Sequence, residues 1–194
     1  PWDARLAAAL VRPLVGTPVT PNHLTTVRGL TGIAGAAVLA GGDAPNTGAW
    51  LIFASNFIDH TDGELARMSG RTSRLGHLYD LSCDALVTVG MFVGIGIGLA
   101  PLLGSSAIVM GALAGGAVAA IFQMRYEIEE GAGKSATRQP RLAGFEAEDV
   151  LYLFPLVTAA GALPGFLKAA ALGAPIAALV VGLQYLRFRR TGGA

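Results

Sequence analysis

Long apolar runs, separated by short polar segments, make up most of the chain. Residues 85–124 contain no charged side chain, and small residues after Pro101 interrupt this run near its middle. The runs 29–58 and 150–186 carry one charge each, Asp43 and Lys168. Because a membrane-spanning helix needs about 20 apolar residues, each run divides into two helices joined by a turn. The pattern predicts six spans, roughly 27–41, 47–66, 77–99, 104–126, 148–163 and 166–187.

The first sixteen residues, PWDARLAAALVRPLVG, interleave leucine and valine with Asp3, Arg5 and Arg12. This stretch is too short to span a bilayer and lacks a signal-peptide cleavage pattern. It is predicted to be an amphipathic helix on the cytoplasmic membrane surface; a partly ordered tail is the alternative. The expected fold is an all-α integral membrane protein, a single domain over 1–194 with a surface helix (1–16) followed by a six-helix transmembrane bundle (27–187).

Composition and charge distribution agree with a membrane protein. The chain is 53% hydrophobic and 14% charged, whereas soluble domains average about 25% charged residues. Of the 14 basic residues, all but Lys168 lie at one end of the predicted bundle. The positive-inside rule puts that end, with both termini, in the cytoplasm. We expect a bacterial or archaeal cytoplasmic membrane and no nucleic-acid partner; the single cysteine, Cys83, excludes an internal disulfide.

The stretch 59–84, DHTDGELARMSGRTSRLGHLYDLSCD, concentrates four aspartates in this apolar chain. Asp59 and Asp62 are three residues apart, and Asp80 and Asp84 four apart, so each pair lies on one face of a helix. A chain reversal between the second and third spans would bring the pairs together. Clustered carboxylates near a bilayer are costly and repel one another. One or two divalent cations would remove both problems, and hard oxygen ligands favour Mg²⁺ or Mn²⁺.

The residues between the aspartates leave two readings open at this point. One is a network of ion pairs in which the carboxylates are neutralised by Arg67, Arg71 and Arg74. The other is a site for phosphoryl transfer, since Arg67 can grip phosphate oxygens while metal-bound carboxylates neutralise a diphosphate. Small residues let a ligand approach the backbone at three positions: Gly63, Ala66 and Gly76.

The pattern resembles the signature of the CDP-alcohol phosphotransferase family. Written out, it is Asp59-x2-Asp62-Gly63-x2-Ala66-Arg67-x8-Gly76-x3-Asp80-x3-Asp84. The resemblance implies a membrane enzyme of phospholipid biosynthesis that acts on a CDP-linked alcohol, of the CDP-diacylglycerol or CDP-amino-alcohol type. Such an enzyme transfers the phospho-alcohol half to an acceptor hydroxyl and releases CMP. It also implies a homodimer within the lipid bilayer.

The same resemblance implies a role for each motif residue. Asp59, Asp62, Asp80 and Asp84 would bind two metal ions, Mg²⁺ or Mn²⁺, and Asp84 would also be the general base on the acceptor hydroxyl. The CDP moiety would be bound by Gly63, Ala66, Arg67, Ser73 and Gly76.

Several neighbouring residues have less specific predictions. The segment TPNHLT (20–25) leads into the first span, where Asn22 is expected to cap the helix, with contact to the nucleotide as the alternative. His60 and His77 flank the aspartates and are expected to be interfacial residues that hydrogen-bond to neighbours, and Cys83 is expected to be a packing residue.

The acceptor stays open at the level of sequence. Basic residues in the loop after the fourth span would suit a phosphate-bearing acceptor: Lys134, Arg138 and Arg141. Acidic residues of the same loop would suit a cationic alcohol instead: Glu146, Glu148 and Asp149. A solvated loop without substrate contact is the third alternative.

Two other classes of membrane protein also use intramembrane carboxylates. An ion-coupled transporter would place them near the midplane and show inverted repeats, and neither feature is evident here. An aspartate-rich membrane prenyltransferase would also use Mg²⁺ and a diphosphate, but resembles this sequence less, because it has a longer chain and two well-separated aspartate motifs.

Overall fold

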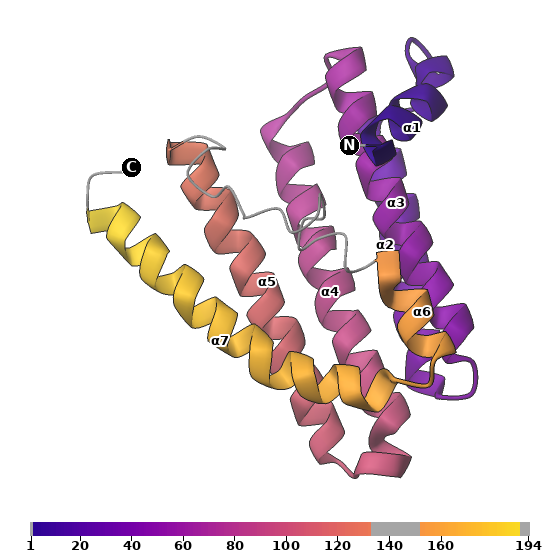
Figure 1. Cartoon of the computed structure of the whole chain (residues 1–194). Coiled ribbons are helices and arrows are strands. Elements are labelled where there is room, and N and C mark those ends of the chain that lie inside the picture. Colours follow the sequence, from indigo (N-terminus) through magenta and orange to yellow (C-terminus); the bar gives the residue numbers. More distant parts are fainter. Residues whose placement is uncertain (1, 133–151, 191–194) are drawn as a thin grey trace.

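The computed structural model describes residues 2–132 and 152–190, which form helices and connecting turns and include no strand (Figure 1). Its elements are α1 (Trp2–Val11), the short 3-10 helix η1 (Arg12–Leu14), α2 (Pro21–Gly41), α3 (Pro45–Ser69), α4 (Arg74–Leu103), α5 (Ser106–Ala132), α6 (Phe154–Ala159) and α7 (Leu163–Arg190). The expectation of an all-α protein is therefore confirmed over the described residues.

Four of these helices, α2, α4, α5 and α7, are long and apolar enough to cross a membrane. The two remaining predicted spans differ from this picture. Helix α3 has 25 residues, but its C-terminal half carries the charged residues of the aspartate motif. Helix α6 has six residues, and part of the predicted range 148–163 lies outside the described residues. The integral-membrane character is borne out, whereas a count of six spans is not established.

Local sequence signals explain where the helices around the motif begin and end. Thr20, and not Asn22 as predicted, is the N-cap of α2, because its side chain and that of His23 form a reciprocal capping box. The side chain of Ser73 caps α4 by accepting the Gly76 N–H at 3.0 Å. Between α3 and α4 the chain reverses at Gly70, whose φ of 65° favours glycine.

The helices pack in a row through glycines at their crossings. Helix α2 packs against α3 and α4, α4 against α5, and α5 against α7 (Figure 1). A Cβ atom added to Gly94 of α4 would clash with the Ala36 carbonyl oxygen of α2, and one added to Gly111 of α5 would clash with the Phe92 carbonyl oxygen of α4. The absence of side chains at these glycines therefore sets the close approach of α4 to both neighbours.

An apolar core joins these helices below the motif. Phe166 of α7 stacks on Phe92 of α4 at 5.9 Å between ring centroids and tilts against Phe154 of α6 at 5.5 Å. The remaining buried core side chains come from α2 to α7: Leu39, Ala49, Ile52, Met91, Ile95, Ala107, Ala114, Leu163 and Leu167.

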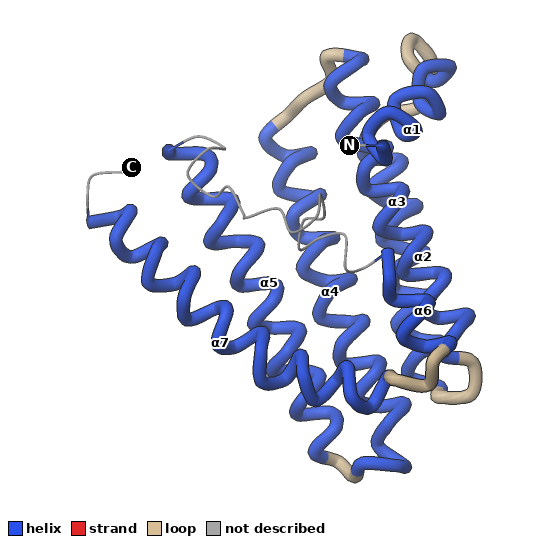
Figure 2. Tube along the Cα trace, in the orientation of Figure 1, coloured by secondary structure: helices blue, strands red, loops and turns tan. Residues whose placement is uncertain are grey.

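The turns lie at two opposite ends of the bundle (Figure 2). The α2–α3 and α4–α5 turns are at one end, and the α3–α4 turn and the C-terminal end of α5 are at the other. Because the aspartate motif flanks the α3–α4 turn, its carboxylates gather toward that second end. Helix α1 packs against α3 and buries Ala7 and Val11.

Candidate active site: a carboxylate cluster around Arg28

Three helices supply the polar groups of the site. Asp59 and Asp62 lie on α3, and Asp80 and Asp84 lie on α4, on either side of the reversal at Gly70. The third contributor is α2, which the sequence pattern had not connected with the motif. The predicted meeting of the two aspartate pairs is thus present in the structure, and it takes place against a third helix.

Arg28 of α2 lies in the middle of the carboxylates. Its Nη1 contacts Asp59 Oδ1 and donates to Asp84 Oδ1 at 2.8 Å. Its Nη2 is 3.4 Å from Asp80 Oδ1 and donates to the Asp80 carbonyl oxygen at 3.1 Å. The Arg28 side chain is 3% exposed, whereas the three carboxylates keep 29%, 32% and 38% of their side-chain surface exposed. The guanidinium therefore lies beneath the carboxylates, which face outward.

Asp62 is bound by another residue of α2, Thr25. It is 4% exposed, and its Oδ2 accepts a hydrogen bond from Thr25 Oγ1 at 2.7 Å. Thr25 precedes Arg28 by three residues, so both side chains leave the same face of α2. Ser55 of α3 donates to the Arg28 carbonyl oxygen at 2.9 Å and ties the two helices together at this level. One face of α2 thus holds all four aspartates.

The carboxylates have the arrangement of a cation site. Asp59, Asp62 and Asp80 each offer one oxygen, and these oxygens lie within 4.8 Å of one another. Carboxylate oxygens are the ligands that Mg²⁺ and Mn²⁺ prefer, and the set contains no sulfur. The residues therefore fit a hard divalent cation. Asp84, predicted as a fourth ligand, is not part of this close group in the described structure.

The predicted nucleotide-binding residues lie between the two aspartate pairs along the chain, at the end of α3 and the start of α4. Arg67 is 62% exposed, and its Nη2 donates to Glu64 Oε1 at 2.7 Å. A Cβ atom added to Gly63 would have only the Arg67 guanidinium in contact, at 3.9 Å, so the backbone there is open. Ala66 is half-buried, and Ser73 caps α4 as described above. The pairing of Arg67 with Glu64 was not anticipated from the sequence.

The first turn of α4 faces the start of α2. A Cβ atom at Gly76 would lie 3.0 Å from both Asn22 Oδ1 and Ser73 Oγ. The absence of a side chain at Gly76 therefore leaves room for the Asn22 amide beside the Ser73 cap. Nearby, the hydroxyls of Thr26 and Tyr79 are 3.0 Å apart. Asn22 thus faces the α4 end of the site, although it does not cap α2.

The histidines and the cysteine near the motif have partners of their own. His60 Nδ1 is 3.0 Å from the Asn56 carbonyl oxygen and 3.3 Å from the Tyr152 hydroxyl. His77 lies against the Tyr126 ring, with centroids 4.5 Å apart. Cys83 is buried against α2, which confirms its packing role.

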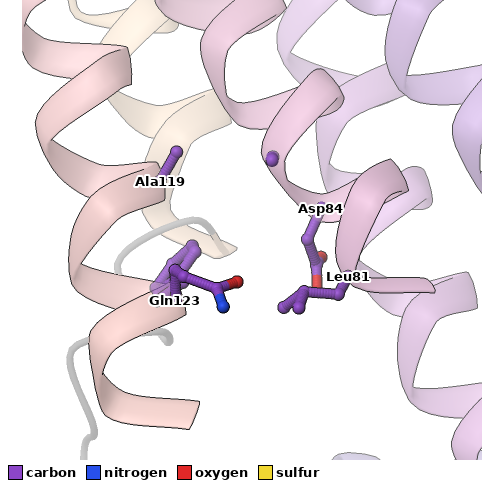
Figure 3. A pocket seen from close by; sticks show the side chains of 6 residues that line it. Leu81, Asp84, Ala119 and Gln123 are labelled. Atoms are coloured by element: carbon purple, nitrogen blue, oxygen red, sulfur yellow. The ribbon is translucent and has the colours of Figure 1, made fainter. Parts of the chain in front are cut away.

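A small cavity adjoins Asp84 between α4 and α5. It has a volume of about 50 Å³ and is lined by Leu81, Asp84, Ala85, Ala119, Phe122 and Gln123. Figure 3 shows Asp84 and Gln123 extending toward this space from facing helices. Asp84 therefore has Arg28 as its ion-pair partner and also borders an open space.

Two of the three arginines that the ion-pair interpretation named have other partners. Arg67 pairs with Glu64 of its own helix, and Arg71 donates to the carbonyl oxygens of Thr17 and Val19 at 3.1 and 3.2 Å. The arginine among the carboxylates is Arg28, which sequence reasoning had counted only as one of the basic residues that orient the chain. The proposed acceptor-binding residues lie outside the described residues: Lys134, Arg138, Arg141, Glu146, Glu148 and Asp149.

Comparisons with known sequences place the cluster within a region that matches a known family. The family model described as CDP-alcohol phosphatidyltransferase matches residues 18–184, which include every residue of the cluster. A curated relative from Rubrobacter xylanophilus, a bifunctional IPC transferase and DIPP synthase, is 33% identical over 170 residues. The match covers 82% of this chain and 36% of that relative, so the chain spans little more than a third of the relative's length.

A solved structure shares the fold. It is the phosphatidylinositol phosphate synthase of Mycobacterium tuberculosis with CDP-DAG bound, which superposes with a TM-score of 0.63 at 19% sequence identity. The superposition covers 94% of this chain and 91% of that protein. The helical fold described above is therefore shared with that synthase.

Proposed function

The chain belongs to the CDP-alcohol phosphatidyltransferase family, whose members are transferases acting on CDP-linked alcohols, and we propose that it transfers a substituted phosphate group from such a donor to an acceptor hydroxyl and releases CMP. The observation that carries the proposal is the convergence of Asp59, Asp62, Asp80 and Asp84 on one face of α2 within the matched region. The product of this reaction belongs to phospholipid biosynthesis.

Asp59, Asp62, Asp80 and Asp84 would hold two divalent cations, Mg²⁺ or Mn²⁺. Support comes from the oxygens of the first three, which lie within 4.8 Å of one another. Bound cations would neutralise the donor diphosphate and stabilise the departing CMP. The protein supplies the geometry, because Thr25 fixes Asp62 and Arg28 fixes the other three carboxylates.

Asp84 is proposed as the general base. Its carboxylate borders the cavity between α4 and α5 (Figure 3), where an acceptor hydroxyl has space beside it. The hydroxyl proton passes to Asp84 while the hydroxyl oxygen bonds to the phosphorus of the transferred group. The bond between that phosphorus and the bridging oxygen breaks, and CMP leaves with the electron pair.

The CDP moiety is proposed to lie along the start of α4 and the end of α3, where it would contact Gly63, Ala66, Arg67, Ser73 and Gly76. Two observations support this. The backbone at Gly63 is open, and the exposed Arg67 guanidinium lies next to it. An arginine in this position can grip a diphosphate bidentately once it leaves Glu64.

The donor is proposed to be CDP-diacylglycerol, with a CDP-amino-alcohol as the second candidate. The structural relative from Mycobacterium tuberculosis has CDP-DAG bound, and a lipid-linked donor suits a site at one end of a membrane bundle. Lys134, Arg138 and Arg141 would hold a phosphate-bearing acceptor.

At the scale of the whole chain, we propose a single domain of six spans with the segment 1–16 as a surface helix. Helix α3 and the region around α6 would supply the two spans beyond the four that meet the length and apolarity requirement. The cluster would face the cytoplasm of a bacterial or archaeal cell, because the basic residues gather at its end. Exposed apolar side chains of α7, such as Leu172 and Leu179, would contact lipid or a second copy in a homodimer.

The test of this function is CMP release by the purified protein in liposomes. CDP-diacylglycerol, CDP-choline and CDP-ethanolamine are each supplied with acceptors that include glycerol phosphate and inositol phosphate, in Mg²⁺, Mn²⁺ or EDTA. We expect CMP only with a divalent cation and one donor–acceptor combination. Release that is equal in EDTA would overturn the metal-dependent reaction, and absence of release with every combination would overturn the proposed transfer.

A further inference from the structure

We propose that Arg28 is a built-in cation of the carboxylate cluster, which occupies the side formed by Asp59, Asp80 and Asp84 so that the protein without donor binds a single divalent ion. That ion would lie among Asp59, Asp62 and Asp80. The inference rests on the metal site of the proposed function and goes beyond it, since it assigns a role to a residue of α2 outside the aspartate motif.

The first line of support is the division of the cluster into two sides. On one side, the oxygens of Asp59, Asp62 and Asp80 lie within 4.8 Å of one another. On the other side, the Arg28 guanidinium makes ion pairs with Asp59, Asp80 and Asp84. Asp59 and Asp80 belong to both sides, and Asp84 belongs only to the side of Arg28. The guanidinium therefore holds the carboxylates that a second metal ion would need.

The second line of support is burial. Arg28 is 3% exposed in a helix that is otherwise apolar enough to cross a membrane. A buried cation is tolerated only when it is paired, and here the pairing is threefold. Its Nε is buried without a hydrogen-bond partner, so the terminal nitrogens make all of its polar contacts with the cluster. Because its side chain is buried, Arg28 cannot release the carboxylates by rotating into solvent.

The third line of support is charge balance. Three carboxylates that face one guanidinium leave an excess of negative charge, and Asp62, which is hydrogen-bonded to Thr25, adds to it. One divalent cation among Asp59, Asp62 and Asp80 offsets most of that excess. A second divalent cation would have to compete with Arg28 for Asp59 and Asp84. It would also be repelled by the positive charge of the guanidinium beside those carboxylates. The donor diphosphate brings the further negative charge that would favour a second ion.

The test is to count bound Mn²⁺ by electron paramagnetic resonance of the free ion, with the full chain in detergent and without nucleotide. We expect one Mn²⁺ per wild-type chain and two per chain of Arg28→Gln, which removes the charge but keeps hydrogen-bonding capacity. Arg28→Lys should restore the count to one. Arg71→Gln is the matched control, because Arg71 is exposed and donates to backbone carbonyls away from the cluster; its count should stay at one.

Thermal stability supplies a second readout. In EDTA, Arg28→Gln should melt well below the wild type, and Mn²⁺ should restore most of the loss because it replaces the missing cation. A purely structural role for Arg28 would give a loss that Mn²⁺ does not restore. If Arg28→Gln does not fold at all, the double variant Arg28→Gln/Asp84→Asn decides, since removal of one carboxylate should recover folding if charge balance is the cause.

The outcomes separate this inference from the proposed function. Two ions on the wild type, or one ion on Arg28→Gln, would overturn the role of Arg28 and leave the metal site standing. No Mn²⁺ bound to the wild type, even with a CDP-linked donor present, would overturn the metal site itself. A double variant that stays unfolded would assign Arg28 a structural role only.

Discussion

Two arginines near the cluster have opposite environments, and their environments decide their roles. Arg28 is 3% exposed and ion-paired to three carboxylates, whereas Arg67 is 62% exposed and paired with a single glutamate of its own helix. Exposed ion pairs contribute little to stability, so Arg67 can leave Glu64 at small cost when a stronger anion arrives. Arg28 belongs to the framework of the site, and Arg67 is available to a ligand.

The central prediction at this scale concerns the base. Asp84→Asn should reduce turnover by about 10²–10⁴-fold, because an amide cannot accept the acceptor's proton. Folding and nucleotide binding should be retained, since the shape of the side chain is kept. Asp43→Asn is the matched control: Asp43 is exposed in the α2–α3 turn at the opposite end of the bundle. CMP release at the wild-type rate by Asp84→Asn would exclude Asp84 as the base.

A second prediction concerns the donor phosphate. Arg67→Ala should weaken binding of a CDP-linked alcohol by roughly tenfold to a hundredfold, the loss expected for a hydrogen bond between charged groups. Isothermal titration with the CDP-linked donor in Mg²⁺ measures this. Arg190→Ala, which removes an exposed arginine at the end of α7, should leave the affinity unchanged. Equal affinities of Arg67→Ala and the wild type would remove Arg67 from the diphosphate site.

The residues of the motif were predictable from the sequence, and their partners were not. Spacing alone puts Asp59 with Asp62 and Asp80 with Asp84, because helical periodicity is local. Arg28 and Thr25 reach these side chains from a different helix, across 31 and 37 positions of the chain. A signal was nevertheless present: Thr25 and Arg28 are polar, three residues apart and on one face of an apolar helix.

At the scale of the elements, the position of the site depends on how closely α4 approaches α2. Gly94 meets the Ala36 carbonyl oxygen with no space for a Cβ atom, and Gly98 meets the Leu39 carbonyl oxygen in the same way one turn further on. Gly32 of α2 faces the Val87 side chain of α4. The close contact between α2 and α4 therefore extends from Gly98 toward Arg28. The separation between Arg28 and Asp84 is therefore set partly by residues far from the chemistry.

A substitution at this crossing tests whether the close approach of α4 to α2 stabilises the protein. Gly94→Ala should lower the free energy of unfolding by about 1–3 kcal/mol, because the new methyl group forces the two backbones apart. Gly116→Ala in α5 is the matched control, since a Cβ atom there meets nothing within 4 Å. Thermal unfolding in detergent compares the two variants. A melting temperature of Gly94→Ala that equals that of the control would show that the crossing tolerates separation.

The pattern of apolar runs predicted where most of the described helices lie. Apolar run length predicted α2, α4, α5 and α7 as spans to within a few residues at most ends. Helix α3 was found as well, although its C-terminal half is charged, and the described part of the region 148–163 is the six-residue α6. Because part of the predicted range 148–163 lies outside the described residues, the sixth span stays a prediction.

At the scale of the whole molecule, most of the charged residues gather at one end of the bundle, and few lie at the other. The carboxylate cluster, the α3–α4 turn and the basic last turn of α7 belong to the charged end, and the α2–α3 and α4–α5 turns belong to the other. A donor with a lipid tail and a charged head would have both parts accommodated by such a molecule, with the head at the cluster and the tail along the exposed apolar helices.

Orientation in the membrane is the prediction at this scale. Two variants with one added cysteine each report the orientation of the bundle: Thr72→Cys in the α3–α4 turn and Asp43→Cys in the α2–α3 turn, both at exposed positions. The native Cys83 is buried. In intact cells an impermeant maleimide should label the cysteine at position 43 and not the one at position 72. In inside-out vesicles the pattern should reverse. Labelling of position 72 from outside would contradict a cytoplasmic site.

The measurement that tests the central claim most directly is thermal stabilisation of the purified protein by candidate donors, because it needs no knowledge of the acceptor. CDP-diacylglycerol, CDP-choline, CDP-ethanolamine and an isoprenyl diphosphate are compared in Mg²⁺, Mn²⁺ and EDTA. We expect one CDP-linked compound to raise the melting temperature in the presence of a divalent cation and to lose that effect in EDTA. No shift with any cytidine compound, or a shift only with the isoprenyl diphosphate, would contradict the account.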